Sequence, residues 1–405
     1  MNRSLAIGAF EAAIRAADAE RSTRALCSYD DTFLAIGGTA VAVAASDIVV
    51  VGIGKAAPGM VRAVCAETGA YRGIVVSDHE EPCPLPIIVG GHPVPDARSY
   101  LAGAAVMREV ASIRPSDVLV ACVSGGGSAL AEQPRPGVTE ADITAMNEVL
   151  IRSGLPIDEV NAIRACASAL KSGHLVDDLA VRAAWTVVIE DVVGGGPPVV
   201  ASGPTLASDL GARAQAIIAD SGLSARLPQA IVAAANRWTR AIAPSSMITV
   251  TAAGPEMAAR ALAAAIDDVR VVVIPEAVTG DVSPGVEAFV AHSPDCTVIG
   301  FGETTVRVTS PQPGGRNQHA ALIAARMLAG SDRVFGAFAS DGRDGTTDAA
   351  GAVVDGSTWE RIRRAGFDPE LAIVDFAAHR ALDAVGATVV TGPTGTNVAD
   401  LWICG

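Results

Sequence analysis

The chain has 405 residues, more than a single hydrophobic core usually serves, so we expect two domains. Its formal net charge of −14 at pH 7 excludes nucleic acid as a favoured partner, because the field of the protein repels phosphate backbones. Half of the residues are hydrophobic and only 18% are charged, which is typical of an α/β protein with buried parallel strands.

The sequence contains no candidate membrane segment. Its best apolar stretch, residues 34–46, stops at Asp47 and contains two glycines, whereas a spanning helix needs about 18 apolar residues. The first 20 residues are typical of an amphipathic helix and not of a secretion signal, because Glu11 breaks their apolar run. The seven cysteines include no C-x-x-C pair. We therefore expect a cytoplasmic protein with no membrane partner, and a homodimer stays open.

Strand-like runs alternate with helical patterns, which indicates βαβ units and a parallel sheet. In the first part of the chain we predict strands at 47–53, 73–77, 85–89, 117–123 and 184–190. Helical patterns there cover 1–20, 57–67, 97–112, 139–179, 212–219 and 227–242. Further on we predict strands at 247–251, 270–274, 296–301, 304–308, 334–339 and 388–391, and helices at 255–266 and 317–328. The stretch 243–246 is the predicted boundary, so the expected domains are 1–243 and 244–405.

Residues 340–356 hold four aspartates and four glycines with one basic residue. We expect neither a packed helix nor a continuous strand there, because the glycines allow turns with positive φ. The carboxylates, with Asp341 and Asp344 foremost, suit a hard cation or polyol hydroxyls. Four other glycine-rich stretches follow or adjoin apolar runs, at 52–59, 124–128, 314–318 and 391–397. Five such loops indicate an enzyme that holds a polyanion, while the alternative is that they are only tight turns.

The first of these loops follows a strand and reads G-x-G-x-x-A from Gly52 to Ala57. This matches a loose dinucleotide-binding fingerprint and, taken alone, favours an NAD-dependent dehydrogenase. Lys55 directly follows Gly54 at the start of a predicted helix, where a cation suits a phosphoryl group or a carboxylate. The alternative for Lys55 is a solvated surface lysine.

The second loop places three consecutive glycines, Gly125, Gly126 and Gly127, between Ser124 and Ser128. Consecutive backbone N–H groups in such a loop form an anion-binding nest, with the serine hydroxyls as further donors. The G-x-S-x-G pattern of a hydrolase nucleophile is absent, because Leu130 stands where the last glycine would be. We therefore predict anion binding for this loop.

Two single polar residues are further candidates. Asp191 stands where a strand opens into glycines and is a candidate Mg²⁺ ligand, since Mg²⁺ binds through one or two carboxylates plus substrate phosphates. A turn or cap aspartate is the alternative. His92 lies between turn residues and is a candidate substrate contact, although a lone loop histidine is more often structural. The other histidines show no metal-ligand spacing.

Arg316 follows Gly314 and Gly315 and opens the helix predicted from Asn317. A guanidinium at that point can stabilise the charge on a transferring phosphoryl group or bind a carboxylate bidentately. The alternative is an arginine paired on the surface at a helix end. Arg316 and Lys55 are the two cations for which the pattern favours a catalytic role.

Together these strings resemble the glycerate 2-kinase family, whose second domain is called MOFRL and whose members are often labelled hydroxypyruvate reductases. The matching strings are VGIGKAAPGM, GGHPVPD, VSGGGSAL, NAIR, DVVGGGPPVVASGPT, GGRNQ, SDGRDGTTDAAGAVVDG and TGPTGTNVADL. They occur in family order between residues 52 and 401. As an ordered set they are specific, although several are loose when taken one at a time.

The resemblance implies an α/β fold with a larger Rossmann-like parallel-sheet domain and a smaller α/β MOFRL domain. It implies ATP-dependent phosphorylation of the 2-hydroxyl of D-glycerate with Mg²⁺, in a cleft between the domains. We expect Lys55 and Arg316 to face one another across that cleft. The family's important lysine and arginine correspond to these two residues. Beyond them, the predicted catalytic residue is Asp191, and the predicted metal ligands are Asp191, Asp341 and Asp344. The predicted substrate or nucleotide contacts are Gly54, His92, Ser124, Gly125, Gly126, Gly127, Ser128, Gly314, Gly315, Asn317, Thr394 and Asn397.

The sequence also departs from the family pattern. Ala165 and Cys166 stand where the family usually carries Lys-His, and Gly195 and Gly196 stand where it carries two acids. Such losses would weaken nucleotide binding or indicate a different sugar acid, and two nearby basic residues would partly compensate, namely Lys171 and His174. The alternatives to the kinase are therefore an NAD(P)-dependent hydroxypyruvate reductase and a homologue with altered substrate or no activity.

Overall fold

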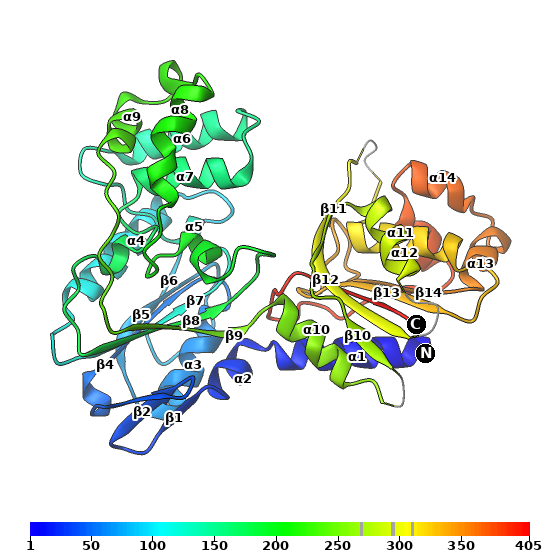
Figure 1. Cartoon of the computed structure of the whole chain (residues 1–405), viewed down its shortest axis with the longest axis horizontal. Coiled ribbons are helices and arrows are strands. Elements are labelled where there is room, and N and C mark those ends of the chain that lie inside the picture. Colours follow the sequence, from blue (N-terminus) through cyan, green and yellow to red (C-terminus); the bar gives the residue numbers. More distant parts are fainter. Residues whose placement is uncertain (268–269, 293–295, 309–311) are drawn as a thin grey trace. The chain divides into compact units, whose positions relative to one another are not determined.

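The computed structural model describes residues 1–267, 270–292, 296–308 and 312–405. The chain divides into two compact units. The central unit consists of Ser22–Ile189 and Gly195–Ala252. The terminal unit consists of Met1–Arg21, Glu190–Gly194 and Ala253–Gly405, and thus contains both chain ends (Figure 1).

The central unit is built on a sheet with the strand order β6-β5-β4-β7-β8-β9. The strands are β4 (Ile48–Ile53), β5 (Arg72–Ser77), β6 (Ile87–Val89), β7 (Val118–Val123), β8 (Ala183–Ile189) and β9 (Met247–Ala253). The pairs β4–β5, β5–β6, β4–β7 and β7–β8 are parallel. This is the Rossmann strand order, in which the chain direction across the sheet reverses between β4 and β7. The expected Rossmann-like sheet is therefore confirmed.

A helical bundle accompanies this sheet. The helices of the central unit are α3 (Ala57–Thr68), α4 (Ala97–Ala111), α5 (Gly127–Leu130), α6 (Glu140–Ile151), α7 (Ile157–Ala167), α8 (Ala214–Asp220) and α9 (Gln229–Asn236). Figure 1 shows α6–α9 gathered together, and they share an apolar core that includes Ile143, Ile163 and Ile231. The long helical stretch predicted at 139–179 is broken between α6 and α7, where Gly154 adopts a positive φ and Pro156 follows.

Smaller elements complete the central unit. An antiparallel sheet that the sequence did not predict contains β1 (Cys27–Tyr29), β2 (Phe33–Ile36) and β3 (Thr39–Ala42). Short 3₁₀ turns lie at Ala45–Asp47, His174–Val176, Pro197–Ser202, Leu210–Arg213 and Leu223–Ala225. Helix α2 (Ala19–Arg24) carries the chain from the terminal unit into the central one. No helix among the described residues is long and apolar enough to cross a membrane.

The terminal unit is built on a mixed sheet with the order β10-β12-β16-β13-β14-β15, and β11 also pairs with β12. The strands are β10 (Val271–Val273), β11 (Val278–Asp281), β12 (Thr297–Thr305), β13 (Val334–Ala339), β14 (Gly351–Asp355), β15 (Thr388–Val389) and β16 (Asp400–Cys404). The helices are α1 (Arg3–Ala16), α10 (Pro255–Ala264), α11 (Val282–Ala291), α12 (Arg316–Met327), α13 (Thr358–Arg364), α14 (Pro369–Val374) and α15 (Ala378–Asp383). The expected second, smaller α/β unit is therefore confirmed.

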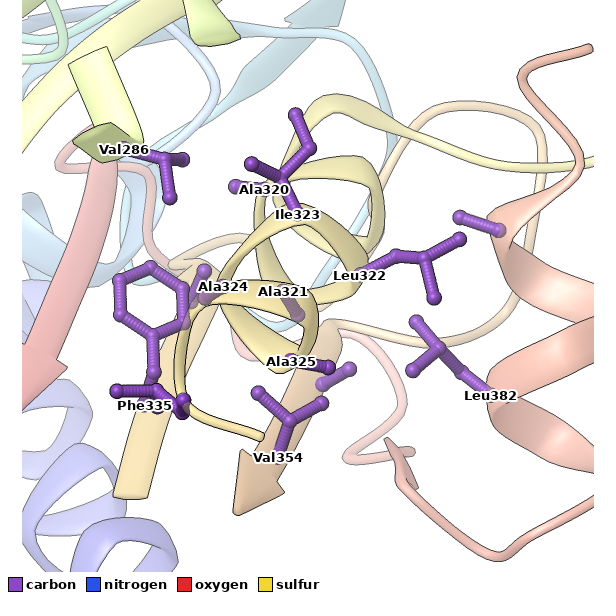
Figure 2. Packing of buried hydrophobic residues seen from close by; sticks show 14 of the residues in the cluster. Val286, Ala320, Ala321, Leu322, Ile323, Ala324, Ala325, Phe335, Val354 and Leu382 are labelled. Atoms are coloured by element: carbon purple, nitrogen blue, oxygen red, sulfur yellow. The ribbon is translucent and has the colours of Figure 1, made fainter. Parts of the chain in front are cut away.

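Helix α12 passes through the core of the terminal unit. Small side chains such as Ala321 and Ala324 let the helix approach its neighbours closely, and they are fully buried. Figure 2 shows the helix packed against Phe335 of β13, Val354 of β14 and Leu382 of α15. Because the helix is fixed on several sides, the position of its first residue, Arg316, is fixed with it.

The division of the chain differs from the predicted boundary at residues 243–246. Strand β9, expected to open the second domain, hydrogen-bonds to β8 and extends the central sheet. Helix α1, expected in the first domain, belongs to the terminal unit, because its Phe10 ring stacks on Phe338 with centroids 4.4 Å apart. The segment Glu190–Gly194, which contains Asp191, also belongs to the terminal unit.

Two further local predictions were wrong. The expectation of no continuous strand within 340–356 fails at Gly351–Asp355, which forms β14, because Ala352, Val353 and Val354 are buried in the sheet. The two strands predicted at 296–301 and 304–308 are instead the single strand β12, Thr297–Thr305. Residues 340–350 and 391–397 do form loops, as predicted.

Candidate functional site

The first candidate region lies where β4 and β7 end. Ile53 of β4 pairs with Val123 of β7, so the loops that follow the two strands lie side by side. Gly54 has a φ of 132°, and a Cβ at this position would lie 2.3 Å from the Ser124 hydroxyl oxygen. The two loops can touch only because residue 54 is glycine.

The hydrogen bonds between these loops bear on the dinucleotide alternative. The backbone N–H of Lys55 donates to the Gly125 carbonyl at 3.0 Å. The N–H of Ala56 donates to the Ser124 hydroxyl, also at 3.0 Å. In a dinucleotide fold, the N–H groups at this helix start bind the pyrophosphate. Here they join two loops of the protein, which disfavours a dehydrogenase.

The glycine loop of the central unit leaves its own donors available. Gly126 has a φ of 82°, and the N–H groups of residues 125–128 donate no hydrogen bond within the described chain. The Lys55 side chain is exposed and passes over this loop, since a Cβ at Gly126 would lie 3.1 Å from its Cγ and Cε. Lys55 and the backbone donors thus share one surface, which suits an anion. The Ser128 hydroxyl accepts from Ser202 Oγ at 3.0 Å.

His92, Gly126 and Ser128 line a cavity of about 170 Å³ in the central unit. Partial burial lowers the pKa of His92, the positive charge of Lys55 lowers it further, and Asp78 opposes the shift. His92 is therefore a neutral imidazole at pH 7. The structure brings together the predicted residues Gly54, Lys55, His92 and Ser124–Ser128 at this end of the sheet.

A cluster of buried charged residues lines this cavity, and of its members Lys171 was already a candidate from the sequence. The Lys171 ammonium donates to the Glu132 carboxylate, and both side chains are buried. Glu132 also accepts from the Ser168 hydroxyl at 2.6 Å. Arg164 donates through Nε to the Asn147 oxygen at 2.9 Å. Burial lowers the pKa of Arg164, and the negative charge of Glu132 opposes this shift. The guanidinium remains charged, because arginine does not lose its proton in proteins.

The wall of this cavity therefore carries two cations, Arg164 and Lys171, and one anion, Glu132. A net positive wall suits a small carboxylate. In the sequence, Arg164 was noted only as part of the NAIR string. Glu132 was not predicted, because its partner Lys171 lies 39 positions further along the chain. Lys171 lines the cavity, whereas His174 instead faces the Trp238 ring edge-on with centroids 6.2 Å apart.

The departures from the family pattern occupy two kinds of position. Ala165 and Cys166 are fully buried in α7, and burial raises the pKa of the Cys166 thiol to about 12, so the thiol is inert. At Gly195 a Cβ would lie 2.3 Å from a methyl group of Val199. Gly196 has a φ of 64°. The turn that replaces the two acids is therefore shaped for glycine.

The second candidate region is a cavity of about 510 Å³ in the terminal unit. Arg316 lines it and donates to Asp400 through Nε at 2.6 Å and through Nη2 at 3.2 Å. Its Nη1 donates to Glu303 at 2.9 Å. Burial lowers the pKa of Arg316, but the two carboxylates raise it by more. Burial raises the pKa of Asp400 to about 6, and Arg316 opposes the shift.

Asp344 caps helix α12. Its carboxylate accepts from the backbone N–H of Asn317 at 3.0 Å and of Gln318 at 2.8 Å, and from both of their side-chain amides. Burial raises the pKa of Asp344, and these four donors oppose the shift. Gly315 must be glycine, since a Cβ there would lie 2.2 Å from the Asp344 carboxyl carbon. Asp344 thus positions the helix start and Arg316 with it.

The other predicted residues of this region divide into two groups. Asp191, Asp341 and Asn397 line the cavity together with Gly314 and Gly315. Asn317 and Thr394 do not: the Asn317 oxygen accepts from the Trp402 indole at 3.0 Å, and the Thr394 hydroxyl donates to the Ser340 carbonyl at 2.5 Å. Both hold the walls of the cavity in place.

The metal assignment stays a prediction. Among the described residues no three histidine, cysteine, aspartate or glutamate side chains converge on a point where they would hold a metal. Asp191 and Asp341 do line one cavity, and Mg²⁺ commonly uses only one or two carboxylates plus phosphate oxygens. Lys55 lies in the central unit and Arg316 in the terminal unit, so their facing one another also stays a prediction.

The fold is that of an α/β protein of two units, with glycine-rich loops after its strands. Residues 5–236 match the family described as "Domain of unknown function (DUF4147)", and residues 296–400 match the MOFRL family. The chain therefore belongs to the DUF4147–MOFRL family, the glycerate 2-kinase family that its motifs resemble.

Several proteins are similar over most of their length. The D-glycerate 2-kinase of Thermotoga maritima is 30% identical, with 88% of this chain and 90% of that protein covered. A protein of Agrobacterium vitis named "Putative hydroxypyruvate reductase" is 36% identical, with 87% of this chain and 86% of that protein covered. The crystal structure of glycerate kinase from Thermotoga maritima matches with a TM-score of 0.86 at 27% identity, over 99% of this chain and 98% of that chain.

Proposed function

We propose that the chain is a glycerate 2-kinase, which transfers the γ-phosphoryl group of ATP to the 2-hydroxyl of D-glycerate or a closely related small sugar acid. The observation that carries the proposal is the similarity to D-glycerate 2-kinase along most of both chains. The family motifs single out two cations: Lys55 borders a loop suited to anions, and Arg316 lines the larger cavity.

In this proposal the central unit binds anionic groups through Lys55 and the free N–H groups of the glycine loop. The adjoining cavity of about 170 Å³, with Arg164 and Lys171 in its wall, takes the carboxylate of the sugar acid. Arg316 stabilises charge on the transferring phosphoryl group. The ion pairs with Asp400 and Glu303 orient the guanidinium before any ligand binds. Positioning and charge neutralisation then supply most of the rate.

Asp191 and Asp341 are the residues proposed to hold Mg²⁺, because they border the same cavity as Arg316. Bound there, Mg²⁺ would neutralise part of the negative charge of the phosphate groups. Asp344 contributes by capping α12, since both of its oxygens already accept N–H donors. The cytoplasm remains the proposed compartment, in keeping with seven cysteines that include no C-x-x-C pair.

A hydroxypyruvate reductase is the second candidate, favoured by the name of the Agrobacterium vitis protein. Against it stand the backbone donors of Lys55 and Ala56, which are used within the protein. One pair of assays separates the two activities. ADP release is measured over glycerate, tartronate, erythronate and threonate with and without Mg²⁺, and NADH oxidation is measured with hydroxypyruvate.

Mg²⁺-dependent ADP release with at least one sugar acid, and no NADH oxidation, is the expected result. Oxidation of NADH by hydroxypyruvate in the absence of ATP would overturn the kinase assignment. Binding of a sugar acid with no ADP release across the panel would instead indicate a homologue without activity.

A further inference from the structure

The wall of the terminal-unit cavity contains an aromatic pair that takes no part in the proposed phosphoryl transfer. The Phe376 ring stacks on the His319 imidazole, with centroids 4.8 Å apart and planes inclined by 20°. Both residues line the cavity of about 510 Å³. Phe376 has a φ of 53°, which is costly for a bulky side chain and is typical of functional sites.

His319 adds a second observation. The residue is only 4% exposed, and within the described chain its buried Nδ1 has no hydrogen-bond partner. The imidazole is therefore held against Phe376 by packing and not by a hydrogen bond of Nδ1. His319 lies three positions after Arg316 on α12, so the two side chains project from neighbouring positions on one face of the helix.

The two cavities differ in volume, just as the two substrates of a kinase, a nucleotide and a small acceptor, differ in size. The terminal-unit cavity of about 510 Å³ is three times as large as the cavity of about 170 Å³ in the central unit. Pockets for ligands of drug or nucleotide size span about 300–1,000 Å³, so only the larger one suits a nucleotide. Its lining combines apolar groups, such as Val306 and Phe376, with the charged groups Arg316, Asp341 and Arg343.

The charge of the lining bears on which form of the nucleotide the cavity can bind. Five carboxyl groups border the cavity, against the two guanidinium groups of Arg316 and Arg343, which gives the lining a formal net charge of −3. An uncomplexed nucleoside triphosphate would be repelled by this wall. The complex with Mg²⁺ is less negative, and its cation is attracted by the carboxylates.

We propose that the terminal-unit cavity binds the purine nucleotide as its Mg²⁺ complex, with the base against the Phe376–His319 pair and its phosphates toward Arg316. This inference rests on the proposed kinase function, which it deepens by assigning the nucleotide to one unit.

The test is calorimetric titration of the full-length protein with Mg²⁺-ADP. Phe376→Ala is expected to weaken binding about tenfold, because base–aromatic stacking is commonly lost at that scale on substitution by alanine. Binding of Mg²⁺-pyrophosphate, which has no base, is expected to stay unchanged. Phe367→Ala is the matched control, because Phe367 is a partly exposed phenylalanine of the same unit that does not line the cavity.

In the turnover assay, Phe376→Ala is expected to raise KM for ATP about tenfold and leave KM for the sugar acid unchanged. If Phe376→Ala does not fold, His319→Gln tests the same pair by the same titrations. Wild-type affinity for Mg²⁺-ADP in the folded variant, or no binding of Mg²⁺-ADP by the wild type at millimolar concentration, would overturn the inference.

The two proposals fail in different ways. Kinase turnover with a KM for ATP that does not depend on Phe376 removes the base site and leaves the kinase. Binding of Mg²⁺-ADP that depends on Phe376, without phosphorylation of any sugar acid, removes the proposed reaction and leaves the nucleotide site.

Discussion

Replacement of Arg316 separates a catalytic role from a structural one. Arg316→Met removes the partner of Asp400, whose side chain is only 3% exposed. Removal of one member of a buried ion pair costs about 3–5 kcal/mol, because the other charge is left uncompensated. Arg316 is partly exposed, so we expect a loss near the lower end, about 3 kcal/mol. The proposed role in catalysis predicts a loss of about 10²-fold or more in kcat/KM.

The double variant Arg316→Met/Asp400→Asn distinguishes the two effects. It removes both charges of the buried pair, so much of the lost stability is expected to return. Glu303 also loses its partner, but its side chain is half-exposed and its charge stays solvated. Activity is expected to stay low, since the guanidinium is still absent. Stability is measured by urea denaturation with circular dichroism, and activity by ADP release.

Recovery of turnover together with stability in the double variant would refute the catalytic role. Arg316 would then be a structural arginine that serves only to neutralise Asp400. A matched control is Arg326→Met on the same helix, because Arg326 pairs with Glu370 at the surface. This replacement is expected to lower the stability by less than about 1 kcal/mol and to leave the activity unchanged.

Three further predictions follow from single positions. Lys55→Ala is expected to lower kcat/KM about 10²-fold with little change in Tm, because the side chain is exposed; an equal loss of Tm would point to a structural role instead. Gly54→Ala is expected to cost about 1–3 kcal/mol in urea denaturation, since its Cβ would lie 2.3 Å from Ser124 Oγ, and an unchanged midpoint would contradict the loop contact. Burial lowers the pKa of His319 to about 4 from 6.5, so the folded state favours the neutral ring. The stability that His319 contributes is therefore highest above pH 6.5 and falls as the pH drops toward 4, because the unfolded state is protonated first; the loss is about 3 kcal/mol at most. His319→Gln has no imidazole, so its stability should fall less between pH 6.5 and pH 4. Equal pH dependence of the two proteins would argue against a buried imidazole.

Local patterns were sufficient for the elements that position the site. The apolar run before Gly52 predicted β4, and the glycines after it predicted the loop that carries Lys55. The strand before Ser124 was predicted in the same way, and the parallel pairing of the two strands then brings their loops together. These features depend on neighbouring residues, which a sequence pattern records.

Features that depend on distant partners were not predicted. The role of Asp344 as a helix cap depends on Asn317, 27 positions earlier, and no motif relates the two. Likewise, an amphipathic pattern indicates that α1 covers an apolar surface and does not say which unit provides it. Strand β14 was missed because its apolar run is short and lies between aspartates and glycines. Its strand state is stabilised by pairing with β13.

The central claim is that the chain phosphorylates a small sugar acid at its 2-hydroxyl. The most direct measurement is transfer of phosphate from γ-labelled ATP to D-glycerate with Mg²⁺ present, followed by assignment of the phosphorylated carbon by NMR. We expect labelled 2-phosphoglycerate from the wild type and a strongly reduced yield of this product from Lys55→Ala. Label on the 3-hydroxyl, or no labelled acid at all while Mg²⁺-ATP is bound, would contradict it.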